Sequence, residues 1–120
     1  MIDSIICTDN PNNFYTWQDL WQNNTLYFKH HIRLFEWAKD NTNELKNLKF
    51  IILDRFTGNH DAIQTNLAKE LRDLGFKGFI ILSSYKHDDG EKVSGFDISI
   101  GSIPISRNEL EEKLCIRKLI

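Results

Sequence analysis

Three short apolar runs divide the chain, and each is closed by polar or turn-forming residues. They cover residues 5–7, 50–53 and 79–82. Each run is too short for a buried helix and is rich in β-branched or aromatic side chains, so each predicts a strand that is buried on both faces. Weaker patterns over residues 25–29 and 96–100 predict two further strands. Strands covered on both faces are typical of a parallel sheet.

Between these runs, apolar residues recur at spacings of three and four, as in helices with one buried face. A first helix is expected after residues 11–13, where an amide side chain offers an N-cap, and it includes Phe14, Trp17, Leu20 and Trp21. A second runs from Leu34 towards Leu45 with a polar break at residues 40–43. A third covers residues 62–74, and the last helix opens at the capping-box sequence of residues 106–109.

Strand and helix therefore alternate along the chain. This order predicts a single α/β domain over residues 1–120, with a doubly wound five-stranded parallel sheet of the flavodoxin-like type. The interval 85–95 is polar and leaves room only for a shortened fourth helix. In such folds, ligands bind beyond the carboxyl ends of the strands. Candidate functional residues are therefore those that directly follow each apolar run.

Charge and cysteine content narrow the function classes. A formal net charge of −2 provides no long-range positive field for nucleic acid. No apolar stretch approaches the roughly 20 residues that span a bilayer, so no membrane insertion is expected. Cys7 and Cys115 lie near opposite ends and form no metal-binding pattern. We therefore expect a cytoplasmic protein.

Acidic and hydroxyl side chains follow three of the predicted strands. Asp9 follows the first strand, Asp54 the central one, and Ser83 with Ser84 the fourth. In a parallel sheet these groups meet at one edge, where two carboxylates suit Mg²⁺. A carboxylate beside bound Mg²⁺ can act as a nucleophile towards phosphorus, and a serine hydroxyl can donate a hydrogen bond to the resulting acyl phosphate.

These segments resemble the receiver domains of two-component response regulators. The resemblance rests on residues 6–11, 51–54, 80–84 and 95–104, which follow the family's order and spacing over essentially the whole chain. It implies a receiver-like signalling domain rather than an enzyme. Asp54 would accept a phosphoryl group from a histidine kinase or phosphotransfer protein, Asp9 and Asp54 would hold Mg²⁺, and Ser83 or Ser84 would engage the phosphate.

Three departures from the family's pattern make a degenerate receiver an almost equal alternative to an active one. Thr8 stands where receivers carry the first of two acids, which weakens Mg²⁺ binding. The lysine expected before Pro104 is absent, and neither Ser99 nor Ile100 supplies the expected aromatic residue. A receiver of this kind would act through protein contacts, as a homodimer or with a kinase, with little or no phosphorylation.

Other interpretations of these residues remain open. Asp54 could simply cap a turn, and Asp9 could form an Asx turn before Pro11. His30 and His31, if on a strand, point to opposite faces and cannot clamp a metal, whereas His60 is expected in the loop after Asp54. The three tryptophans are expected in the core, at positions 17, 21 and 37.

A flavodoxin-like enzyme or small-molecule binder is a rival class. It would use a glycine-rich turn after the first strand, and residues 8–13 contain no glycine. A hydrolase is disfavoured as well, because no GxSxG sequence follows any predicted strand. The remaining rival is a pure protein-interaction module.

Overall fold

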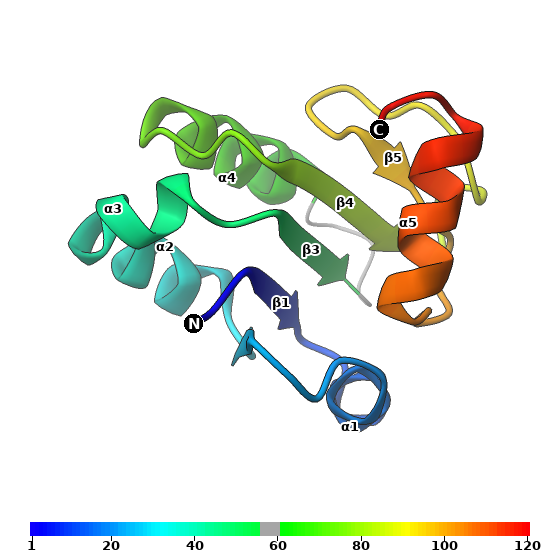
Figure 1. Cartoon of the computed structure of the whole chain (residues 1–120), viewed down its shortest axis with the longest axis horizontal. Coiled ribbons are helices and arrows are strands. Elements are labelled where there is room, and N and C mark those ends of the chain that lie inside the picture. Colours follow the sequence, from blue (N-terminus) through cyan, green and yellow to red (C-terminus); the bar gives the residue numbers. More distant parts are fainter. Residues whose placement is uncertain (56–60) are drawn as a thin grey trace.

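The computed structural model describes residues 1–55 and 61–120, and the side chains of residues 1–54 and 66–120 within them. Five strands form one sheet in the order β2-β1-β3-β4-β5, and all four pairings are parallel (Figure 1). The strands are β1 (Ser4–Thr8), β2 (Thr25–Phe28), β3 (Phe50–Arg55), β4 (Phe79–Ser84) and β5 (Ile98–Ser99). This order defines a flavodoxin-like doubly wound sheet and confirms the predicted fold class.

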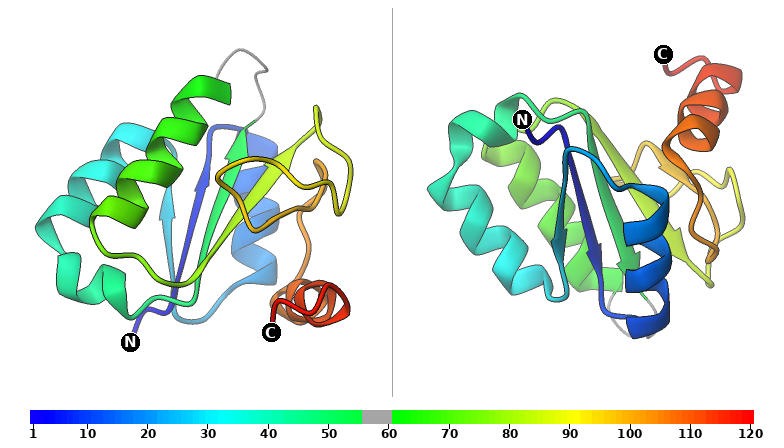
Figure 2. Two further views of the ribbon diagram at one scale, coloured as in Figure 1. Left: turned by 90° about the horizontal axis from the view of Figure 1, so that it is seen from above. Right: turned by 60° about the horizontal axis from the view of Figure 1, so that its bottom comes forward.

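Helices cover both faces of the sheet (Figure 2). On one face lie α1 (Pro11–Leu20) and α5 (Arg107–Ile116). On the other face lie α2 (His31–Asp40), α3 (Thr42–Lys46) and α4 (Asp61–Asp73). Among the described residues, none of these helices combines the length and the apolar composition that crossing a membrane requires.

The side-chain alternation of the strands divides the core into two layers. Ile6, Ile52 and Ile81 pack beneath Trp17 of α1 and Leu110 of α5. The neighbouring positions Ile5, Ile51 and Ile80 pack on the opposite face, under α2, α3 and α4. Two residues further along each central strand, Thr8, Asp54 and Ser83 therefore belong to the face that α1 and α5 cover.

The helix boundaries confirm the periodicity and correct one detail. The polar break separates α2 from α3 at Asn41, and Ser106 caps α5 by accepting a hydrogen bond from the Glu109 amide at 3.2 Å. The cap of α1, however, is Asn10, whose Oδ1 accepts from the Asn12 amide at 3.0 Å. Pro11 occupies the first helical position, where a missing N–H costs nothing, so the cap precedes Asn12 and Asn13, the amide residues that were expected to provide it.

His30 and His31 lie beyond the end of β2, so the argument from opposite faces of a strand does not apply to them. β2 ends at Phe28, His30 has extended backbone geometry as the N-cap residue of α2, and His31 is the first residue of that helix. The predicted helix began at Leu34, so it missed the first three residues of α2. The structure therefore places these two histidines at the carboxyl edge of the sheet.

The last strand is shorter than predicted. Oδ2 of Asp97 accepts a hydrogen bond from the Ile80 amide at 2.8 Å and pairs with Arg72 at 3.0 Å. The carboxylate of Asp97 thus accepts the hydrogen bond of a backbone N–H of β4, directly before the short ladder of β5 begins at Ile98. The interval 85–95 contains turns and irregular backbone. The shortened fourth helix that was expected there is therefore absent.

Arg107 ties the start of α5 to the amino end of β1. Its guanidinium donates to both carboxylate oxygens of Asp3, at 2.8 and 3.1 Å, and to the Ser4 hydroxyl at 3.1 Å. It also lies over the Trp21 ring, 4.7 Å from the centroid. This planar, bidentate pairing holds α5 at the end of the sheet opposite to the candidate site.

Candidate functional site

The strand register brings three polar residues together at the carboxyl edge of the sheet. Thr8 is the partner of Asp54 in the β1–β3 ladder, and Ser83 is the partner of Asp54 in the β3–β4 ladder. All three residues are buried. Ser84 pairs with Arg55 instead, and therefore points to the other face of the sheet.

One oxygen of Asp54 accepts three side-chain hydrogen bonds. Its Oδ2 lies 2.7 Å from Nε1 of Trp17, 3.0 Å from Nδ2 of Asn13 and 3.2 Å from Oγ1 of Thr8. Asp54 is only 2% exposed. The carboxylate is therefore enclosed by donors from β1 and α1, which compensate for part of its lost hydration.

The Thr8 hydroxyl is held in a defined orientation. Its oxygen accepts a hydrogen bond from the Asn10 amide at 3.2 Å, so its single proton is left for Asp54. The same Asn10 caps α1 through its own side chain. Thr8 thus links the carboxylate of β3 to the first turn of α1.

None of the three donors was predicted as a functional residue, since Thr8 was noted only as a departure from the receiver pattern. Asn13 and Trp17 lie one helical turn apart on α1 and reach the carboxylate from the same face of that helix. Trp17 was expected in the core, which its complete burial confirms, but its indole N–H also needs an acceptor there. The spacing of four residues between Asn13 and Trp17 was the signal in the sequence that could have indicated this pair.

Burial raises the pKa of Asp54 above its usual value of 3.8, and the negative charge of Asp9 adds to the rise. The hydrogen bonds from Trp17, Asn13 and Thr8 lower the pKa but do not overcome burial. Relative to bulk water, the site therefore shifts the equilibrium of Asp54 towards its protonated, neutral form.

The two candidate serines have other partners in the structure. The Ser83 hydroxyl donates to the carbonyl of Gly101 at 3.0 Å, and that carbonyl also accepts from the Ser84 amide at 2.7 Å. The Ser84 hydroxyl accepts from the Lys86 amide at 3.2 Å. Gly101 has a φ of +74°, which suits glycine and turns the chain at the end of β5. Both serines therefore support the connection between β4 and β5.

Asp9 and Asp54 are the two carboxylates that could hold Mg²⁺ at this edge. Asp9 follows Thr8 and is half-buried. The described part of the chain contains no group of three or more acidic, histidine or cysteine side chains suited to a metal ion. The N–H and O–H donors around Oδ2 of Asp54 fit a cation poorly, because a metal ligand must present a lone pair to the ion. His60 lies outside the described residues.

Comparisons of the chain with protein-family models and with curated proteins found no match. The class of protein that fold and site define is therefore an α/β protein with a flavodoxin-like sheet and a buried acid at the end of its central strand.

Proposed function

We propose that the chain is a receiver-like signalling domain that acts through protein contacts, without phosphorylation of Asp54. The observation that carries this proposal is the set of three donors on Oδ2 of Asp54, a carboxylate that is almost completely buried. In this arrangement, the carboxylate acts as a hydrogen-bond acceptor that joins β3 to β1 and α1.

The receiver-like part of the proposal is supported by the position of the acid within the fold. Asp54 lies near the end of β3, the central strand of a sheet with the order β2-β1-β3-β4-β5, and pairs with Thr8 of β1 and Ser83 of β4. The resemblance in sequence concerns the same strand ends. Fold and spacing together favour a receiver ancestry over an unrelated flavodoxin-like enzyme, whose phosphate-binding turn would need glycine after β1.

The absence of phosphorylation is supported by the groups around the acid. At the position where receivers carry a carboxylate, Thr8 presents a hydroxyl whose proton is directed at Asp54. A phosphoryl group arriving at Oδ2 would displace the indole of Trp17, which is itself completely buried. The raised pKa of Asp54 also lowers the ionised, nucleophilic fraction relative to an exposed aspartate.

Protein contacts are supported by large apolar side chains on the surface. Tyr85 and Ile103 follow the last two strands, Ile116 is the last residue of α5, and Leu119 follows that helix; all four are exposed. The turn segment between β4 and β5 is tied to α5 by the pair of Asp89 with Lys113 at 2.6 Å. We propose a homodimer or a kinase complex as the partner state.

We also propose a cytoplasmic location. Both cysteines are free, Cys7 buried and Cys115 exposed, which fits a reducing compartment.

Intact-mass measurement tests this proposal. The folded protein and its Asp54→Asn variant are incubated with acetyl phosphate and Mg²⁺, and we expect neither to gain a phosphoryl group at residue 54. Sedimentation of the same samples should give one oligomeric state with and without Mg²⁺. A mass gain in the native protein that the Asp54→Asn variant lacks would overturn the proposal in favour of an active receiver.

A further inference from the structure

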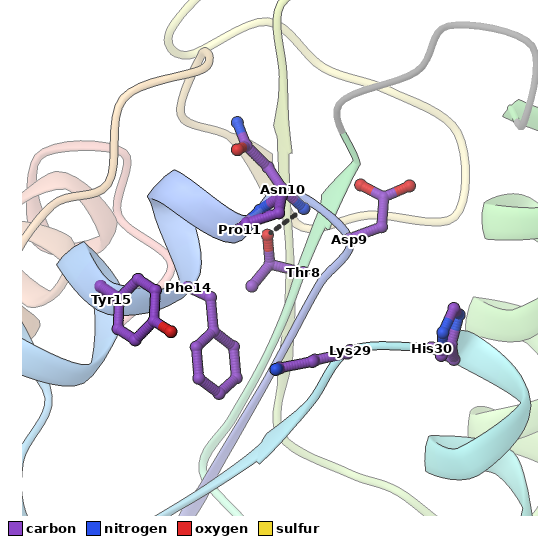
Figure 3. Close-up of a pocket in the computed structure, with 8 residues that line it drawn as sticks. All are labelled: Thr8, Asp9, Asn10, Pro11, Phe14, Tyr15, Lys29 and His30. Carbon is purple, nitrogen blue, oxygen red and sulfur yellow. Dashed lines mark hydrogen bonds between the residues drawn. The ribbon is translucent and has the colours of Figure 1, made fainter.

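A small cavity lies beside the Asp54 site, between the ends of β1 and β2 and the first turns of α1. Its volume is about 170 Å³, and Pro11, Phe14, Tyr15 and Lys29 are among the residues that line it (Figure 3). It borders the Asp54 network only through Thr8. Its position, outside the carboxyl ends of parallel strands, is where ligands bind in doubly wound sheets.

One wall of the cavity is apolar and rigid. The Phe14 ring packs edge-on against Tyr15, with centroids 5.7 Å apart, and against Tyr27 at 5.9 Å. Pro11 at the start of α1 adds a second apolar surface. A flat apolar group fits such a wall, because the ring that would receive it is already held in place.

The facing side of the cavity is cationic. Nζ of Lys29 lies over the Phe14 ring, 4.8 Å from its centroid, and His30 follows on the same lining segment. His30 is the N-cap residue of α2, but its side chain makes no capping hydrogen bond. The Lys29 ammonium group beside an apolar wall favours a ligand that carries one anionic end, whereas the His30 ring points away from this wall (Figure 3).

Asp9 also lines the cavity, and its negative charge acts at the other end. The negative charge of Asp9 raises the pKa of Asp54, so its electrostatic effect extends towards β3. Figure 3 shows the Asp9 carboxylate and the Lys29 ammonium group pointing in different directions. An anionic ligand group at Lys29 therefore avoids the carboxylate of Asp9.

We propose that this cavity binds a small carboxylate with a planar apolar part. The carboxylate pairs with the Lys29 ammonium group, and the planar part lies against Phe14 and Pro11. The volume restricts the ligand to one ring or a chain of similar size. This inference is independent of the function proposed for Asp54.

Titrations followed by ¹⁵N–¹H NMR test the proposal with three probes: benzoate, benzyl alcohol and inorganic phosphate. Benzoate should shift the amide signals of Asn10, Phe14 and Lys29 saturably, with a Kd of about 1 mM, as expected for so small a ligand. Benzyl alcohol lacks the charge and phosphate lacks the ring, so both should bind about tenfold more weakly or worse.

Lys29→Gln should weaken benzoate binding about tenfold, and Lys29→Arg should retain it. Lys39→Gln is the matched control, because Nζ of Lys39 also lies 4.8 Å from the centroid of a phenylalanine ring, that of Phe35, away from the cavity. The proposal fails if benzoate gives no saturable shifts at these residues. It also fails if benzyl alcohol or phosphate binds as tightly as benzoate, or if the two Lys→Gln variants bind benzoate equally.

Discussion

The indole nitrogen of Trp17 donates a 2.7 Å hydrogen bond to Oδ2 of Asp54, although 37 positions separate the two residues in the chain. Both side chains are almost completely buried. The bond joins the central strand to α1, and Asn13 and Thr8 complete the set of donors on the same oxygen. The acid that the sequence marks as a reactive group is therefore also a structural acceptor.

Replacing Asp54 separates its charge from its role as acceptor. Asp54→Ala leaves three donors without their acceptor and should lower the free energy of unfolding by about 3 kcal/mol. Asp54→Asn keeps an oxygen for these donors and removes a charge that burial disfavours, so it should be at least as stable as the native protein at neutral pH. Urea unfolding of both variants measures the difference. Equal losses in both variants would contradict the acceptor role.

The raised pKa of Asp54 predicts a pH dependence of stability with a defined sign. Between the usual value of 3.8 and the raised pKa, the folded protein binds more protons at this residue than the unfolded chain does. The contribution of Asp54 to the free energy of unfolding therefore falls as pH rises through this window, and then levels off. The stability of Asp54→Asn minus that of the native protein should rise over the same window. A difference that falls with pH would indicate a lowered pKa instead.

Thr8→Asp restores the acid that the receiver resemblance implies. Without metal, a further carboxylate beside Asp54 and Asp9 should cost about 2 kcal/mol of stability through like-charge repulsion. Millimolar Mg²⁺ should raise the Tm of this variant and leave the Tm of the native protein unchanged. Thr8→Val controls for the lost hydroxyl. A native protein that Mg²⁺ stabilises as much as the variant would show that Thr8 does not limit metal binding.

Arg107→Gln should lower the free energy of unfolding by about 1.5 kcal/mol, because it removes a bidentate pair that is also stacked on Trp21. Arg33→Gln is the control, since Arg33 and Glu36 form an exposed pair at 3.8 Å, and it should cost less than about 0.5 kcal/mol. Thermal unfolding compares the two variants. Equal costs would mean that Arg107 contributes no more than a surface charge.

The same pair has a pH signature of its own. Burial raises the pKa of Asp3, but hydrogen bonds from Arg107 and Ser4, together with nearby positive charge, outweigh it and leave the pKa below its usual value of 3.8. The contribution of Asp3 to stability is thus present at neutral pH and lost as pH falls through its folded pKa. The cost of Arg107→Gln should shrink in acid accordingly.

The fold could be predicted because local patterns and the sheet agree. Runs such as residues 50–53 are too short and too β-branched to be anything but buried strands, and the parallel arrangement follows from their burial. The same argument predicted that Asp9, Asp54 and a serine follow strands at one edge of the sheet, whereas the register pairs Asp54 with Thr8 and Ser83. The short β5 could not be predicted, because it depends on a side-chain contact between Asp97 and the Ile80 amide.

The candidate site was only partly predictable. Strand ends indicate which acids meet, but the number of donors on Asp54 depends on how α1 docks against the sheet. Trp17 satisfies the pattern of a core residue whether or not its N–H has a partner. The start of α2 at His31 was missed because the predicted apolar face begins only at Leu34.

The NMR signal of the Trp17 indole N–H reports most directly whether this group donates a hydrogen bond to Asp54. In ¹⁵N–¹H spectra, with the signal assigned through a Trp17→Phe variant, we expect slow exchange with solvent and a shift that follows the titration of Asp54. The Asp54→Asn variant should abolish the pH-dependent shift. An indole proton that exchanges rapidly and does not respond to Asp54→Asn would contradict the hydrogen bond on which the proposed function depends.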